Sequence, residues 1–170
     1  MANQTSLPIR IFSWLSVLWI ARVFLTSIPY KFSQSPDTQH IFGTIGAWLG
    51  GFFGEGLGNA FAQLGPYVIG SAEILASLIL LLPGLLWIGS KLNLCRALDA
   101  SPFHALGGLF ASAIMAGAVF FHLFSPLGIE VLHNGEGDGG SLFYAAVSIL
   151  VLGIVLFFIN GRRLSNPFNQ

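Results

Sequence analysis

Charged residues are scarce in this chain. Seven Lys/Arg and seven Asp/Glu amount to 8% of its 170 residues, about a third of the roughly 25% that is typical of soluble domains. Hydrophobic residues make up 54%, and the mean hydropathy is +0.77. So few charges cannot cover the surface of a soluble globule, and this hydrophobic content excludes a disordered chain, which combines low hydrophobicity with high net charge. The composition therefore indicates an integral membrane protein whose first partner is the lipid bilayer.

Cysteine and net charge are also nearly absent. Cys95 is the only cysteine in the sequence, which excludes an internal disulfide and any metal or redox site built on paired cysteines. The formal net charge is zero, so there is no basic field to attract nucleic acid.

Apolar runs of about 20 residues, the length that crosses about 30 Å of hydrocarbon as a helix, occur four times. They are Ile11–Pro29, Tyr67–Ser90, His104–Phe124 and Leu142–Asn160. A helix satisfies its backbone groups within one segment, so the sequence predicts an all-α four-helix membrane bundle that forms a single domain over residues 1–170. In the third span, Gly108, Ser112 and Ala116 form a small-residue ridge. Its partner is either another helix of this chain or a second protomer.

Positive charges gather on one side of this four-span arrangement. They are Arg10, Lys91, Arg96, Arg162 and Arg163. The loops on the other side are acidic and hold Asp37, Glu55, Glu130, Glu136 and Asp138. Because Lys and Arg are enriched in cytoplasmic loops, we expect both termini to face the cytoplasm and the acidic loops to face outward.

The first outer loop, Tyr30–Pro66, is long for a connection within a helical bundle. Its apolar residues recur at helical spacing, at Ile41, Ile45, Trp48, Leu49 and Phe52. Glycines interrupt this pattern, which favours an extra interfacial or re-entrant helix over a fifth span. That helix has two interpretations: a cap on the outer end of the bundle, or a lid over a binding site.

Two ionisable residues, Arg22 and Glu73, lie inside apolar spans, where a charge costs about 2.5–3.5 kcal/mol. Each lies six or seven residues from the outer end of its span, which at 1.5 Å per residue is about 10 Å deep. The shared depth predicts a buried Arg22–Glu73 ion pair between the first two spans. The pair is either a structural lock or part of a site that binds a polar head group or handles protons.

Lys31 and His122 lie near the same outer ends. With Arg22 and Glu73 they form a candidate ligand-binding cluster whose chemistry suits a quinone-like carbonyl, a lipid head group or a proton relay. Haem ligation is excluded because His104 and His122 occupy opposite ends of one helix. The sequence also holds no di-iron pattern, no phosphate-binding loop and no other metal-ligand set. These absences favour a protein without catalytic residues or a covalently bound cofactor.

Four sequence elements occur in order along the spans: Arg22, Tyr30-Lys31-Phe32, Glu73 to Leu81, and Met115 to Ala118. In this order they resemble the DoxX-like family of small four-helix bacterial inner-membrane proteins. The resemblance covers roughly residues 20–158. The chain departs from the family pattern at Ile28, where a glycine is usual, and in its longer first outer loop.

The resemblance implies a bacterial inner-membrane protein. Some family members are linked to quinone-coupled sulfur oxidation or thiol redox homeostasis, although a fold alone does not transfer a chemistry. We therefore expect an accessory or structural component of a redox- or quinone-linked system, or of another larger membrane complex. The alternative is a small-molecule or quinone-binding or transport protein that uses Arg22, Lys31, Glu73 and His122. Since four helices make a thin pathway, this alternative requires a homo-oligomer or a site at an interface between protomers.

Overall fold

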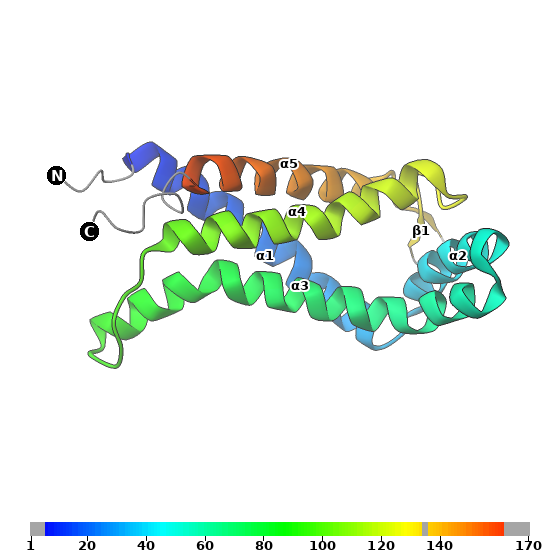
Figure 1. The fold of residues 1–170 in the computed structure, drawn as a ribbon, viewed down its shortest axis with the longest axis horizontal. Coiled ribbons are helices and arrows are strands. Elements are labelled where there is room, and N and C mark those ends of the chain that lie inside the picture. The colour runs from blue at the N-terminus through cyan, green and yellow to red at the C-terminus, as the bar shows by residue number, and fades with distance from the viewer. Residues whose placement is uncertain (1–5, 134–135, 162–170) are drawn as a thin grey trace.

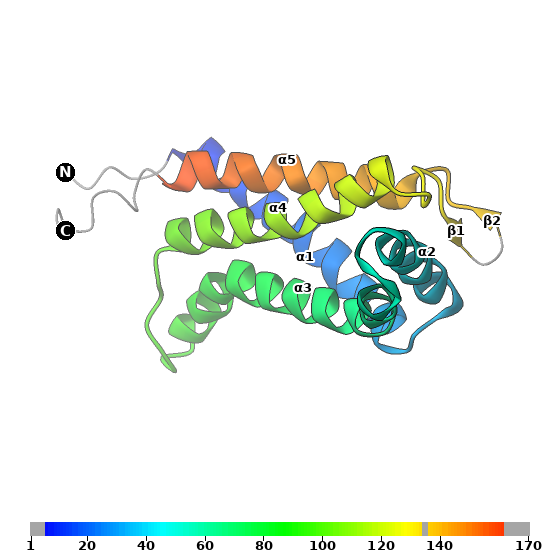
Figure 2. The ribbon, with the colours of Figure 1, turned by 45° about the vertical axis from the view of Figure 1, so that its right-hand side comes forward.

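The computed structural model describes residues 6–133 and 136–161 and is all-helical apart from one short hairpin (Figure 1, Figure 2). In chain order the described elements are α1 (Leu7–Phe32), α2 (Pro36–Phe53), α3 (Glu55–Lys91), α4 (Ala100–Phe124), β1 (Leu132–His133), β2 (Glu136–Gly137) and α5 (Ser141–Gly161). α1, α3, α4 and α5 are long and apolar enough to cross a membrane, which confirms the four predicted apolar helices. The start of α1 and the end of α5 lie at one end of the bundle, the terminal end, and α2 lies at the other, the α2 end (Figure 1).

Two helices extend beyond their predicted bounds because each continues through a proline. α1 runs past Pro29 to Phe32, and α3 begins at Glu55, well before Pro66. A proline removes its own N–H from the helix ladder, but neighbouring contacts can keep the helix intact. α3 has 37 residues and is therefore about 55 Å long at 1.5 Å per residue. Part of it must project beyond a hydrocarbon layer of about 30 Å.

α2 forms a tight hairpin with the first turns of α3. The two helices meet at Gly46 and Gly58, where a Cβ added to Gly46 would lie 2.6 Å from the Gly58 carbonyl oxygen. Gly54, with φ +93°, makes the turn between them. The glycines that interrupt the apolar pattern thus allow close helix packing. A helix in the first outer loop is present as predicted, and its position at or within the bilayer surface stays a prediction.

α4 and α5 pack closely through small residues. A Cβ on Gly108 of α4 would lie 2.8 Å from the carbonyl oxygen of Gly153 on α5, and Ser112 Oγ donates to the Leu150 carbonyl at 2.9 Å. Most of the predicted small-residue ridge therefore faces another helix of this chain, whereas Ala116 is exposed.

Asp138 organises the connection into α5. Its carboxylate accepts hydrogen bonds from the backbone N–H groups of Val131, Gly140 and Leu142, each at 2.9 Å, and from Ser141 Oγ at 3.1 Å. Partial burial raises the pKa of this carboxyl, but the four hydrogen bonds together outweigh it and hold the pKa below its usual value. The acidic loop is thus tied to the start of α5 by a charged group.

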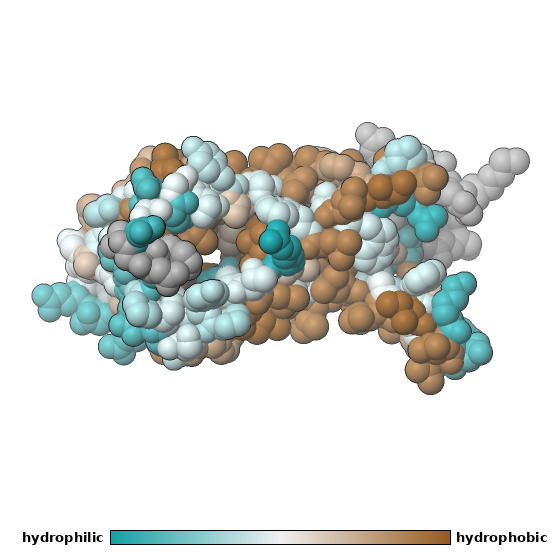
Figure 3. All heavy atoms as spheres, turned by 180° about the vertical axis from the view of Figure 1, so that it is seen from behind, coloured by the Kyte–Doolittle hydropathy of each residue, from teal (hydrophilic) through white to brown (hydrophobic). Residues whose placement is uncertain are grey.

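The core lies where the four long helices meet. Its buried side chains come from all of them and include Val17, Ile20, Phe24, Leu80, Met115, Ile149 and Leu156. Outside the core, large apolar side chains cover the bundle surface. Figure 3 shows hydrophilic side chains gathered mainly at the two ends, with one isolated hydrophilic patch near the middle of an apolar face. Such a surface suits contact with lipid. The predicted cytoplasmic termini stay a prediction, and Arg162 and Arg163 lie outside the described residues.

Candidate functional site

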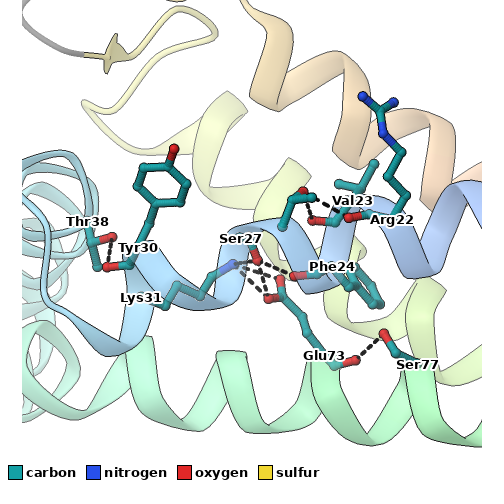
Figure 4. Close-up of polar contacts among 10 residues, drawn as sticks. Arg22, Val23, Phe24, Ser27, Tyr30, Lys31, Thr38, Glu73 and Ser77 are labelled. Carbon is teal, nitrogen blue, oxygen red and sulfur yellow. Dashed lines mark hydrogen bonds and ion pairs between the residues drawn. The ribbon is translucent and has the colours of Figure 1, made fainter.

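A buried ion pair joins Lys31 of α1 to Glu73 of α3 (Figure 4). Lys31 Nζ lies 2.7 Å from Glu73 Oε2 and 3.0 Å from Oε1, and it donates to Ser27 Oγ at 2.7 Å. Ser27 Oγ in turn lies 2.9 Å from Glu73 Oε2. Only 3% of the Glu73 side chain and 16% of the Lys31 side chain are exposed. Lys31, Ser27 and Glu73 thus form a closed cluster with balanced charges, the polar triad.

The helix geometry explains how Lys31 reaches Glu73. Side chains on a helix tilt toward its N-terminus, so Lys31, in the last turn of α1, extends back over Ser27 and into the bundle. Gly70 lies one turn before Glu73 on α3, and a Cβ there would lie 2.6 Å from the ring of Phe32 and 3.6 Å from Lys31 Cδ. The missing side chain of Gly70 therefore leaves room for the Phe32 ring, beside the aliphatic stem of Lys31.

The predicted Arg22–Glu73 ion pair is wrong. Lys31 and Ser27 occupy the Glu73 carboxylate, whereas the Arg22 guanidinium points away from it and lies 5.7 Å from the centroid of the Trp19 ring (Figure 4). The depth of a residue along its helix does not determine which way its side chain points. At 3.6 residues per turn, Arg22 lies about 140° around α1 from Ser27, so the two side chains cannot both face α3.

His122, the fourth residue of the predicted cluster, has contacts of its own. It is buried near the end of α4, where its Nδ1 lies 2.6 Å from the carbonyl oxygen of Gly128. A carbonyl only accepts, so Nδ1 carries the proton. The ring packs edge-on against Phe143 of α5, with 5.6 Å between centroids. The structure therefore brings Lys31 and Glu73 together and gives Arg22 and His122 other partners.

The contacts of the polar triad indicate what it can do. The three N–H donors of Lys31 face three oxygens, which matches the capacity of an ammonium group. Removing one partner from such a buried pair leaves an uncompensated charge, at a cost of about 3–5 kcal/mol. No group of three or more His, Cys, Asp or Glu that could hold a metal occurs in residues 6–133 and 136–161. The geometry favours a lock between α1 and α3 over an open binding site.

Ser27 is the member of the triad that the sequence analysis missed. It lies four residues before Lys31, the spacing at which two side chains meet on one helix face. The predicted end of the first span at Pro29 placed Lys31 outside the helix, so the four-residue spacing between Ser27 and Lys31 did not predict a contact between them.

Comparison with known proteins adds no assignment to the site. No family model, no curated protein and no solved structure matches this chain. The function must therefore follow from the geometry of the described residues.

Proposed function

We propose that this protein is a DoxX-like, non-catalytic accessory subunit of a larger membrane complex. The observation that supports the proposal best is the position of Arg22. Its side chain is exposed on α1, a helix apolar enough to span a membrane. In the part of the chain that the structure describes, the only ion pair within 4 Å is Lys31–Glu73, so Arg22 has no carboxylate partner there.

Arg22 lies well inside α1. It precedes Phe32, the last residue of α1, by ten residues, which is about 15 Å along the helix at 1.5 Å per residue, so with α1 spanning the bilayer Arg22 lies within the hydrocarbon layer. A charged side chain at this depth costs about 2.5–3.5 kcal/mol on insertion scales. Such residues usually face a protein interior or a water-filled cavity, and Arg22 faces outward.

Trp19 offsets only part of this cost. The Arg22 guanidinium lies over its ring, a contact worth about 0.5–2 kcal/mol. Trp19 Nε1 donates to Ser148 Oγ of α5 at 3.0 Å, which ties the ring to α5. Arg22, Trp19 and Ser148 define a polar face on an otherwise apolar surface, the Arg22 face.

The chemistry of the Arg22 face indicates its partner. A second copy of this chain offers no suitable acid, because Glu73 is already paired and the other described acids lie outside the four spans or at their ends. The partner is therefore a different membrane helix with an Asp or Glu near its midpoint, because a buried guanidinium pairs best with a carboxylate. By its DoxX-like resemblance, the complex belongs to a redox- or quinone-linked system of the bacterial inner membrane.

Co-purification tests this proposal. The tagged protein is extracted from its native membrane in a mild detergent, and its partners are quantified by mass spectrometry. We expect at least one stoichiometric multi-pass partner with wild type, loss of that partner with Arg22→Gln, and partial retention with Arg22→Lys. Arg96→Gln, at an exposed loop position, is the matched control and leaves recovery unchanged.

Three outcomes would overturn the proposal. If the wild-type protein migrates as a lone chain, it is not part of a larger complex. If the partner is recovered equally with Arg22→Gln, the Arg22 face does not bind it. If two differently tagged copies capture each other without any other chain, the protein is a homo-oligomer, as expected of a binding or transport protein, and not an accessory subunit.

A further inference from the structure

A pocket of about 690 Å³ lies at the terminal end of the bundle, far from the polar triad. It is bordered by α1, the last turns of α3, and residues of α4 and α5. Its polar lining consists of Arg10, Ser13, Asp99, Ser101, His104 and Asn160. Figure 3 shows the end of α3 and the loop after it standing off from the rest of the bundle, with a hollow between them. The volume falls within the range of small-molecule sites, about 300–1,000 Å³.

One polar atom in this pocket has no partner. His104 is 1% exposed, and its Nε2 is buried without a hydrogen bond in the described part of the protein. A buried polar atom left unsatisfied costs about 1–3 kcal/mol, and native proteins leave few of them. His104 lines the pocket while its Nε2 is closed to solvent, so an oxygen of a bound molecule satisfies this nitrogen when the imidazole turns toward the cavity.

Trp14 and α3 flank His104 on one side. Trp14 packs edge-on against its ring, with 4.6 Å between centroids, and the far side of Trp14 rests on Gly84 of α3. A Cβ on Gly84 would lie 2.8 Å from Trp14 Cη2, so the glycine leaves space for the indole. Pro83, inside α3, removes a backbone hydrogen bond where the helix bends away from the bundle. The pocket is thus built by specific residues of three helices.

The charges of the lining indicate the class of ligand. Arg10 and Asp99 carry the only formal charges in it, and these cancel. Asn160 Nδ2 is already bonded to Ser13 Oγ at 3.1 Å and Ser101 Oγ to Asp99 Oδ1 at 3.1 Å, and His104 Nε2 is the fully buried side-chain atom without a partner among the described residues. Leucine, isoleucine and tryptophan side chains make up most of the remaining lining. The lining therefore offers no excess of opposite charge to a charged head group, whereas its apolar side chains can contact an apolar chain over much of its length.

We propose that this pocket binds an uncharged amphiphile of the bilayer, with a hydroxyl or carbonyl oxygen hydrogen-bonded to His104 Nε2 and an apolar body against Trp14. The imidazole suits both oxygens, because Nε2 donates in one tautomer and accepts in the other. The proposal does not depend on the Arg22 face, which lies on the outer surface of α1.

Tryptophan quenching by brominated amphiphiles tests the proposal on the full chain in detergent. The probes are 11-bromoundecanol, with an uncharged hydroxyl, and 11-bromoundecanoate, with the same chain and a negative charge. We expect saturable quenching by the alcohol and only weak, non-saturating quenching by the carboxylate. Because Trp14 and Trp87 both line the pocket, the double variant Trp14→Phe with Trp87→Phe should remove most of the saturable part. His104→Ala should raise the half-saturating concentration roughly tenfold. His40→Ala, at an exposed position of α2, is the matched control and should not change it.

A measurement on the wild-type protein guards against misfolded variants. With ¹⁵N-labelled histidine, the Nε2 resonance of His104 should move on addition of bromoundecanol, while that of His40 stays in place. Non-saturating quenching by both probes, or a fixed His104 resonance, would show a pocket that holds water only. Binding of the carboxylate as tightly as the alcohol would overturn the uncharged class, and unchanged affinity in a folded His104→Ala protein would overturn the role of His104. A monoacylglycerol and a long-chain ketone then distinguish the hydroxyl source from the carbonyl source.

Discussion

The two partners of the Lys31–Glu73 pair should respond unequally to substitution. Lys31→Met keeps the length of the side chain and removes its charge. It leaves a Glu73 carboxylate that is 3% exposed with Ser27 as its remaining side-chain partner. An uncompensated buried charge of this kind costs about 3–5 kcal/mol.

Glu73→Gln should be milder. The amide oxygen of the new side chain and Ser27 Oγ can still accept from Lys31 Nζ, and the Lys31 side chain is 16% exposed in the last turn of α1. The ammonium can therefore shift toward the end of the helix, and we expect a loss of about 1–3 kcal/mol. The double variant Lys31→Met with Glu73→Gln holds no buried charge, so its loss should be smaller than the sum of the two single losses by at least about 1 kcal/mol.

The free energy of unfolding can be measured by far-UV circular dichroism, with SDS titrated into mild-detergent micelles. Arg96→Gln, at an exposed loop position, serves as the control and should change the free energy of unfolding by no more than about 0.5 kcal/mol. Arg22→Gln, which removes only the ring contact with Trp19, should cost less than Lys31→Met. Additive losses in the double variant would show that the pair is not coupled. A loss with Arg22→Gln as large as that with Lys31→Met would restore Arg22 as the partner of Glu73.

Three further predictions follow from the helix contacts and the loop before α5. Gly153→Ala should destabilise the bundle by about 1–3 kcal/mol, since the new Cβ would meet the α4 backbone, whereas Gly117→Ala, with nothing within 4 Å, should be neutral or slightly stabilising in thermal unfolding. Gly46→Val should separate α2 from α3 and expose the hairpin to limited proteolysis, while Gly51→Val, in open space, should leave it protected. Asp138→Asn should cost about 0.5–2 kcal/mol at pH 7. Because folding lowers the pKa of Asp138, this stabilisation is fully present above the unfolded pKa, near 3.9, and is lost as the pH falls through the lower folded pKa. The stabilities of the variant and wild type should therefore begin to converge below about pH 4 and become equal only below the folded pKa.

The fold was predictable where apolar runs are long and uninterrupted. The spans of α4 and α5 match their predicted bounds within a few residues, because the runs from His104 and Leu142 are bounded by polar segments. The errors concern α1 and α3, where Pro29 and Pro66 were taken as ends. Proline ends most helices in water, yet within a packed bundle the neighbouring helices can hold the chain in helical form.

The candidate site was predictable in depth and not in direction. Spacing along the chain placed Arg22 and Glu73 in one layer, and it did not state which face of α1 each residue occupies. The pocket at His104 was not predicted from the sequence, for a different reason. Its polar lining comes from segments far apart in the sequence, such as Ser13 and Asn160, and each is an ordinary small polar residue within an apolar run. Only packing reveals that they surround one cavity.

The polar residues of α1 themselves argue that Arg22 faces a partner. Ser13, Arg22 and Lys31 are spaced nine residues apart, and nine residues are about two and a half helical turns. Ser13 and Lys31 therefore share one face, where they meet Asn160 and Glu73, and Arg22 lies half a turn away on the opposite face. Rotating α1 to bring Arg22 inside would break both of these contacts. A bundle that keeps its buried polar contacts must present Arg22 outward, which supports the proposal that the partner for its charge comes from outside the chain.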